Sequence, residues 1–239
     1  MIAKSTLAVL IVSAASCCTF AYPCPEAGVS GSDSLKGEKP DTSQSQIAKI
    51  DDHTYRLGNL VIDGDRREIT IPGRINMQRG MIELLACAPG GKVHESVLVL
   101  DVAPYHLQVA LLLLGLQNGG GLQYQGDPRT PKGDSVEVWV KWNTGIHDTT
   151  VRGEDCVWDI PRGKPMEHTP WVFVGSRMDN GKFVADIEKS LITTFHDPLT
   201  ILDNPLPTGG DDELYKVNEK LVPPKGTPVR VILKSLKQK

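Results

Sequence analysis

The chain has 239 residues, a formal net charge of −3 and a sequence pI near 6.1. It lacks a basic surface field and a cluster of Lys and Arg, so we do not expect it to bind nucleic acid. Hydrophobic residues make up 40% of the chain. The roughly 190 residues that follow the N-terminal region are enough for one ordinary domain with a sizeable core.

The N-terminal region has the layout of an export signal. Lys4 precedes an apolar run at residues 7–12, and small residues then lead to Cys17. A positive start, a short apolar core and a small-residue exit are typical of such signals, and the run is too short for a permanent membrane helix. We therefore expect residues 1–21 to direct export, with the protein in the periplasm or held outside the cytoplasm.

Two processing routes fit this region. Residues 14–17 resemble a lipobox, which would make Cys17 a lipidated N-terminus, and ordinary cleavage after Ala21 is the alternative. Residues 22–50 are rich in Gly, Ser, Pro and charge, and this composition predicts a flexible tether. A single domain is expected at residues 51–239. A lipid anchor would be its only contact with a membrane.

Short β-prone segments dominate the domain. An Asn-Gly pair between two strand patterns is a strong hairpin signal, and strict alternation of apolar and polar residues indicates a strand with one buried face. The alternation is clearest at residues 136–142, and Asn180-Gly181 marks one hairpin. Residues 88–91 predict a second hairpin between two apolar strands. The predicted strands are residues 55–57, 60–62, 68–71, 81–87, 93–100, 136–142, 171–175, 182–187 and 229–233.

One helix is predicted at residues 105–116, with Asp101 as its N-cap. It has almost no polar face, and a helix that is apolar all round is expected to be buried. The predicted fold is therefore α+β, a strand-rich antiparallel sheet packed around one buried apolar helix. On this interpretation Leu112→Asp would prevent folding, because it would bury an unpaired charge.

The residues with the most chemical interest stand at the entrance to a predicted central strand. His94, Glu95 and Ser96 precede an apolar run, and strand alternation would put His94 and Ser96 on one face and Glu95 on the other. Burial of a carboxylate and an imidazole there would shift both pKa values, as at many functional sites. The structural alternative, which we favour, pairs Glu95 with Arg74 or Arg79.

Hydrolase and metal patterns are weak. Ser96 and Ser176 are possible nucleophiles with His94 or His196 as base, but no G-x-S-x-G elbow is present. No H-E-x-x-H pattern occurs, and no metal site is predicted. The acidic residues Asp203, Asp211, Asp212 and Glu213 could collect calcium, but their spacing fits no EF-hand loop, so a solvated acidic turn is the favoured interpretation.

Two cysteines fall within the predicted domain, Cys87 and Cys156. In an oxidising compartment they can form a disulfide, and the alternative is that both are small buried apolar residues. No C-x-x-C pattern is present, so a zinc ribbon or a redox dithiol is not indicated.

Four motifs in this order resemble the YdjY-like domain family of exported bacterial proteins. They are residues 73–76, 91–96, 110–116 and 171–176. The resemblance implies export and a single domain covering most of residues 51–236. The resemblance also marks six motif residues as a binding site, without assigning a role to any of them: Arg74, Asn76, His94, Glu95, Ser96 and Ser176. Some members are labelled ferredoxin-like, but this chain has no cysteine run with cluster-ligand spacing, so we expect no cofactor.

These observations favour an exported binding or accessory protein of the cell envelope, without catalysis. Its partner would be a ligand or envelope protein that contacts a cleft around His94, Glu95 and Ser96. The first alternative is a hydrolase or metal-assisted enzyme in which Glu95 is the base and His94 a ligand or acid. The second is a purely structural envelope module, which predicts an exposed apolar patch and no pocket.

Overall fold

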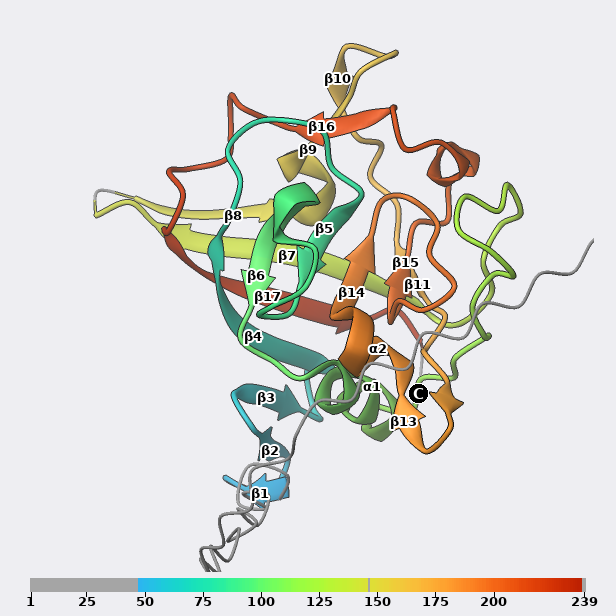
Figure 1. The fold of residues 1–239 in the computed structure, drawn as a ribbon. Helices are drawn as coiled ribbons and strands as arrows, with labels where there is room; N and C mark the ends of the chain where they lie inside the picture. The colour runs from blue at the N-terminus through green and yellow to red at the C-terminus, as the bar shows by residue number, and fades with distance from the viewer. Residues whose placement is uncertain (1–46, 146, 238–239) are drawn as a thin grey trace, which may run out of the picture. The chain divides into compact units, whose positions relative to one another are not determined.

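The computed structural model describes residues 47–145 and 147–237. The predicted export signal, the predicted lipidation site at Cys17 and the predicted tether up to residue 46 lie outside these residues. Most of the described strands belong to one sheet (Figure 1). They are β1 (Ile47–Lys49), β2 (Thr54–Leu57), β3 (Leu60–Asp63), β4 (Glu68–Ile75), β5 (Leu84–Cys87), β6 (Ser96–Leu100), β7 (Ser135–Asn143), β8 (Asp148–Arg152), β11 (Trp171–Phe173), β14 (Ser190–Thr193), β15 (Leu202–Asp203) and β17 (Pro228–Ser235).

The smaller elements surround this sheet. In the described part of the chain, one small sheet and one short hairpin stand beside it, with two α-helices and three 3₁₀ turns. They are β9 (Val157–Asp159), β10 (Lys164–Pro165), β16 (Tyr215–Val217), β12 (Met178–Asp179), β13 (Lys182–Phe183), α1 (Pro104–Leu113), α2 (Val184–Glu188), η2 (Val93–Glu95), η3 (Gly153–Cys156) and η4 (Pro207–Gly210). No helix in the described part of the chain is long and apolar enough to cross a membrane.

The sheet closes on itself. Eight strands pair in the order β4-β17-β7-β11-β15-β14-β5-β6, and β6 pairs back onto β4 to complete a barrel. The long strands alternate, as the predicted pattern of β7 required, and every second side chain of β7 and β17 is buried. These inward side chains fill the barrel, so the core needs no central helix.

The predicted fold class is therefore wrong. The protein is a closed, mostly β barrel, and α1 is not enclosed by a sheet. Figure 1 places α1 and α2 together at one end of the barrel. The inner side of α1 packs into the core through Leu107, Ala110 and Leu111, but Leu112 and Leu113 are 46% and 55% exposed. The prediction that Leu112→Asp prevents folding is accordingly withdrawn.

The start of α1 also differs from the prediction. Ala103 occupies the N-cap position and has no capping side chain. The Tyr105 N–H instead donates to Asp186 Oδ1 of α2 at 3.0 Å, which satisfies one of the free donors of the first turn. Asp101 lies before the helix and pairs with Arg74. The cap therefore comes from a segment distant in sequence, which residue spacing does not reveal.

Gly73 allows the barrel to close. The first half of β4 pairs with β3, and its second half pairs with β6, with Gly73 opposite Leu100. A Cβ atom at Gly73 would lie 2.6 Å from the Val99 carbonyl oxygen and 2.7 Å from Leu100 Cδ2. Only glycine permits this approach, so residue 73 is a packing requirement at the closing seam.

One predicted hairpin is confirmed and the other is not. Asn180 and Gly181, with φ of 47° and 74°, join β12 to β13 in an antiparallel hairpin, although these strands are shorter than predicted and α2 follows at once. Residues 88–91 do not form a hairpin, because β5 and β6 are parallel, with Leu84 opposite Ser96. β14 and β15 are parallel as well, so the sheet is not purely antiparallel.

Two further expectations change. The predicted tether reaches residue 50, yet residues 47–49 already pair with β2 as strand β1.

Cys87 and Cys156 are both buried as free thiols and belong to separate hydrophobic clusters, so the predicted disulfide is absent. Burial raises the pKa of both thiols, that of Cys156 to about 12, so both remain protonated.

Candidate functional site

A buried amide shapes the entrance to β6. The Asn76 side chain follows β4 and donates to the carbonyl oxygens of Val93 at 2.5 Å and Ser96 at 2.7 Å. These two bonds hold residues 93–95 as the 3₁₀ turn η2 rather than as strand. The predicted alternation of side chains along residues 93–96 is therefore wrong, and the strand starts at Ser96.

The parallel pairing of β5 and β6 brings two carboxylates together. Glu83 precedes β5 and Glu95 precedes β6, and the Glu83 N–H donates to the Glu95 carbonyl oxygen at 3.1 Å. Parallel strands start at the same edge of a sheet, so residues just before them become neighbours. Glu83 was not identified from the sequence, because no local pattern links it to Glu95.

Lys92 lies between these carboxylates. Its Nζ is 2.9 Å from Glu83 Oε2 and 3.2 Å from Glu95 Oε1. Desolvation lowers the pKa of Lys92, but its hydrogen bonds to Glu83 and Glu95 outweigh this effect and leave the pKa above its usual value. The ammonium group is therefore a permanent charge that both carboxylates share. Neither Arg74 nor Arg79 occupies this place, contrary to the favoured interpretation.

The acidic turn after η4 supplies a second wall. The Ile82 N–H donates to the Tyr215 carbonyl oxygen, and Met81 bridges to Lys216, so the chain before Tyr215 lies beside Glu83. A cleft of about 320 Å³ opens between the two walls. It is lined by Met81, Ile82, Glu83, His94, Glu95, Asp212 and Glu213.

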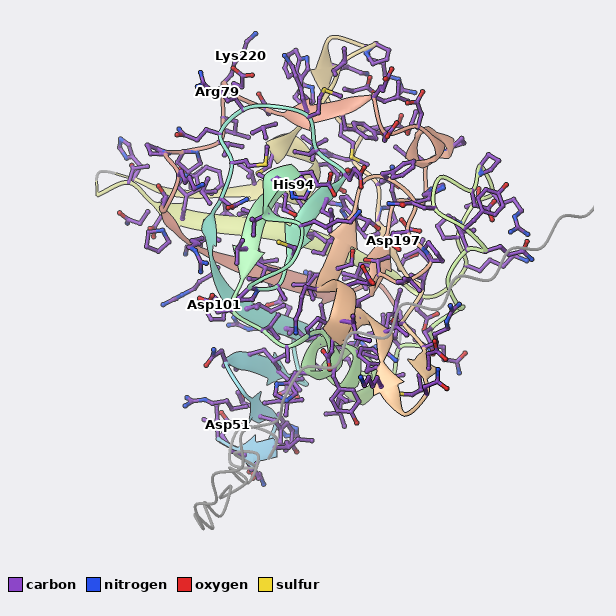
Figure 2. The ribbon with its side chains drawn as sticks, viewed as in Figure 1. Asp51, Arg79, His94, Asp101, Asp197 and Lys220 are labelled. Atoms are coloured by element: carbon purple, nitrogen blue, oxygen red, sulfur yellow. The ribbon has the colours of Figure 1, made fainter. Side chains whose placement is uncertain are left out.

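Negative charge dominates this cleft. Four carboxylates line it against the single ammonium of Lys92, so the formal charge is −4 + 1 = −3 with His94 neutral. His94 stands at the rim with its side chain 77% exposed and Nε2 3.6 Å from Glu95 Oε2. Figure 2 shows His94 on the turn that precedes β6, well apart from Arg79. The cleft therefore favours a cationic ligand.

The other residues of the predicted site do not line the cleft. Arg74 is exposed and its Nη1 is 3.1 Å from Asp101 Oδ1. Ser96 is fully buried, and its hydroxyl donates to the Lys92 carbonyl oxygen at 2.7 Å. Ser176 lies at the junction of α1 and α2, where its N–H donates to Gln108 Oε1 and its hydroxyl oxygen accepts from the Ala185 N–H.

The hydroxyl and imidazole groups of the hydrolase hypothesis are engaged elsewhere. His196 is fully buried, and its ring nitrogens face the backbone carbonyl oxygens of Asp127 and Asn204 at 2.5 and 2.8 Å. Within the described residues Ser176 makes no hydrogen bond with His196, and the Ser96 hydroxyl donates to the backbone carbonyl oxygen of Lys92. These contacts give the three side chains structural roles in the described residues.

Asp203 occupies a different environment from Asp212 and Glu213, with which the sequence grouped it. It is fully buried on β15, and its Oδ1 accepts hydrogen bonds from Thr193 Oγ1 and the Asn204 N–H, each at 2.9 Å. Burial raises the pKa of Asp203 well above its usual range, although those hydrogen bonds act in the opposite direction.

Over residues 47–145 and 147–237, no group of three or more His, Cys, Asp or Glu side chains is arranged to hold a metal ion.

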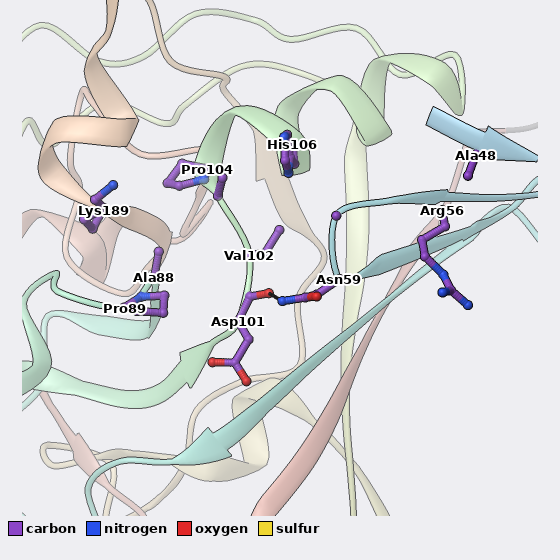
Figure 3. A pocket seen from close by; sticks show the side chains of 12 residues that line it. Ala48, Arg56, Asn59, Ala88, Pro89, Asp101, Val102, Pro104, His106 and Lys189 are labelled. Carbon is purple, nitrogen blue, oxygen red and sulfur yellow. Dashed lines mark hydrogen bonds between the residues drawn. The ribbon is translucent and has the colours of Figure 1, made fainter. Parts of the chain in front are cut away.

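A second hollow, of about 520 Å³, lies beside the start of α1 (Figure 3). Its floor is partly backbone, and Asn59 Nδ2 donates to the Asp101 carbonyl oxygen at 3.1 Å. Its cations Arg56 and Lys189 stand at opposite ends in Figure 3. Since they do not converge on a common point, this hollow is a weaker candidate than the acidic cleft.

The described residues define a closed β-barrel with a small, negatively charged cleft at one edge. A comparison with protein families matches the YdjY domain to residues 60–234, which is most of the chain. The protein therefore belongs to the YdjY domain family, and the resemblance noted in the sequence is confirmed. No curated protein and no solved structure matches the chain.

Proposed function

We propose that this protein is an exported binding protein of the cell envelope, and that the acidic cleft binds a cationic group. The sequence features at residues 1–21 support export, either to the periplasm or to a lipid anchor at Cys17. The cleft supports binding, since Glu83 and Glu95 lie side by side, half-buried, with only Lys92 between them. The convergence of two carboxylates on one ammonium group is the observation that carries the proposal.

The arrangement is better suited to binding an organic amine or guanidinium group than to transferring a proton. Glu95 already contacts Lys92, and Asp212 and Glu213 on the facing wall are exposed and make no ion pair within the described residues. A ligand with two or more amino groups could contact both walls at once. Linking two contacts in one ligand makes the second contact intramolecular, which raises affinity without further protein groups.

Calorimetry on the full processed chain tests binding, with spermidine and trilysine as the probes. We expect the parent to bind at least one of them at low salt, and Glu95→Gln and Glu83→Gln each to weaken binding about tenfold, or about 1.4 kcal/mol. Glu188→Gln is the matched control, because Glu188 is exposed on α2 and outside the cleft. Equal affinity for all four proteins, or no heat with either probe, would contradict the proposal.

Export has its own test. The N-terminal peptide of the protein recovered from its native envelope should begin at Cys17 with attached acyl chains, or at Tyr22 after ordinary cleavage. Mass spectrometry distinguishes these products. Recovery of the intact Met1 terminus in the cytoplasmic fraction would contradict export and would leave the binding result unaffected.

A further inference from the structure

Two cations lie opposite each other on the outer side of the barrel. Lys141 of β7 and Arg230 of β17 are cross-strand partners, and both belong to the alternate residues that point away from the core. Such partners have Cβ atoms about 4.5–5.5 Å apart, and like charges directly opposite each other destabilise a sheet. Further along the same strands, Lys234 has Glu137 and Glu68 as its partners, so opposite signs meet there. The pairing of Lys141 with Arg230 therefore departs from the pattern of its own sheet.

The flanking strands do not neutralise this pair. Arg230 has Pro72 of β4 on its other side, and Lys141 has Thr150 of β8, so neither of these neighbours is charged. The Lys141 Nζ is 3.8 Å from Asp148 Oδ2, but the Asp148 side chain is 62% exposed, so water weakens this ion pair. Arg230 makes no ion pair with any residue that the structure describes. Natural proteins keep a local conflict of this kind mainly at functional sites.

A hollow of about 560 Å³ borders the two cations. Pockets for small ligands usually have volumes of about 300–1,000 Å³, so an organic ligand fits this space. Asp101 also lines the hollow, and its carboxylate is 3.1 Å from Arg74 Nη1. The charged residues that line the hollow, together with the partner of Asp101, are three cations and two carboxylates: Arg74, Lys141 and Arg230 against Asp101 and Asp148. Their formal charge is therefore +1, and it is highest where Lys141 meets Arg230.

We propose that this hollow binds the carboxylate of a small organic ligand between Lys141 and Arg230. One negative charge neutralises the group, and the planar guanidinium of an arginine matches the two oxygens of a carboxylate. Pro72, Trp142 and Pro228 also line the hollow, so the ligand would carry an apolar body beside its carboxylate. The proposal does not depend on what the acidic cleft binds, since no residue lines both.

An NMR titration of the full processed chain with benzoate tests this proposal, and benzamide is the neutral probe of the same shape. At low salt we expect saturable shifts in the backbone amides of Lys141 and Arg230 with benzoate, and none with benzamide. Arg230→Gln and Lys141→Gln should each weaken benzoate binding about tenfold, because each removes a charged hydrogen-bond donor. Lys234→Gln is the matched control, since Lys234 lies on the outer side of the same strand but outside the hollow, and it should bind benzoate as the parent does. No saturable shift with benzoate, equal shifts with benzamide, or equal affinity in all four proteins would overturn the proposal.

Thermal unfolding without a ligand tests the premise separately. If Lys141 and Arg230 repel each other, Arg230→Gln should raise the unfolding temperature at low salt by about 1–2 °C. The gain should disappear at about 1 M salt, where surface charges are screened. Lys234→Gln should not raise the unfolding temperature, because it removes a charge that has two carboxylate partners. A lower unfolding temperature for Arg230→Gln, or a gain that persists at high salt, would show that the pair is not in conflict and would overturn the proposal.

Discussion

Asn76 connects the closing seam of the barrel to the acidic cleft. It follows the half of β4 that pairs with β6, and its amide binds both ends of the turn that carries His94 and Glu95. The side chain is buried, so water cannot replace the bonds that it makes. A residue of the predicted site thus supports the cleft from below, without contacting a ligand.

Asn76→Ala should leave two carbonyl oxygens without their donor, and an unsatisfied buried group costs about 1–3 kcal/mol. We expect a loss of about 2 kcal/mol in the free energy of unfolding and weaker spermidine binding, because the Glu95 turn loses its support. Asn59→Ala removes an exposed amide that also donates to a backbone carbonyl oxygen, and it should cost much less. Equal losses in the two variants, measured by urea unfolding, would argue against this role.

Asp203 gives the protein a specific pH dependence. Burial raises its pKa in the folded state above the ordinary value of 3.8, so the folded state binds this proton more tightly than the unfolded state. The resulting stability is complete below the unfolded pKa and is lost as the pH rises through the folded pKa. A one-unit difference in pKa corresponds to about 1.4 kcal/mol.

Asp203→Asn should therefore raise the unfolding temperature near neutral pH and have little effect near pH 4. The amide keeps an acceptor for Thr193 and the Asn204 N–H, and it carries no charge to bury. Thermal unfolding of the two proteins from pH 4 to pH 8 measures this difference. If the variant were less stable by the same amount at every pH, Asp203 would not be a buried carboxyl with a raised pKa.

The sequence identified His94 and Glu95 correctly as residues at the entrance to a strand, but it identified only half of the cleft. The two residues are adjacent in sequence, so a local pattern could place them. Glu83, Asp212 and Glu213 join them only through the β5–β6 pairing and the bridge from Met81 to Lys216. Such long-range pairings have no signature in residue spacing.

Among the elements, β4 decides whether the sheet closes. Gly73→Ala would bring a Cβ to 2.6 Å from the Val99 carbonyl oxygen, which is backbone and cannot move aside freely. Overpacking of this kind costs about 1–3 kcal/mol. We expect Gly73→Ala to lower the free energy of unfolding by about 2 kcal/mol. An unchanged unfolding midpoint would show that the seam is looser than described.

The β patterns differ in what they could predict. Strict alternation in β7 and the Asn180-Gly181 turn depend on neighbouring residues, and both were predicted correctly. The direction of β6 relative to β5 could not be predicted from neighbouring residues. A strand that is buried on both faces has the same apolar character in either direction. The apolar sequence of α1 predicted burial on all sides, but in the described residues only its inner side packs into the core.

For the molecule as a whole, stability should not depend on a disulfide. Cys87 and Cys156 should resist iodoacetamide in the folded protein and react fully in denaturant without reductant, because both are buried free thiols. Mass spectrometry of the alkylated peptides gives the answer. Peptides that become reactive only after reduction would show that the two thiols are bonded.

The most direct test of the central claim, that the acidic cleft is the binding site, is an NMR titration of the full processed chain with spermidine. Binding in the cleft predicts saturable shifts concentrated in the backbone amides of Glu83, Lys92–Glu95, Asp212 and Glu213, which Glu95→Gln weakens. Shifts scattered over acidic residues elsewhere on the surface, or no shift at the cleft, would contradict it.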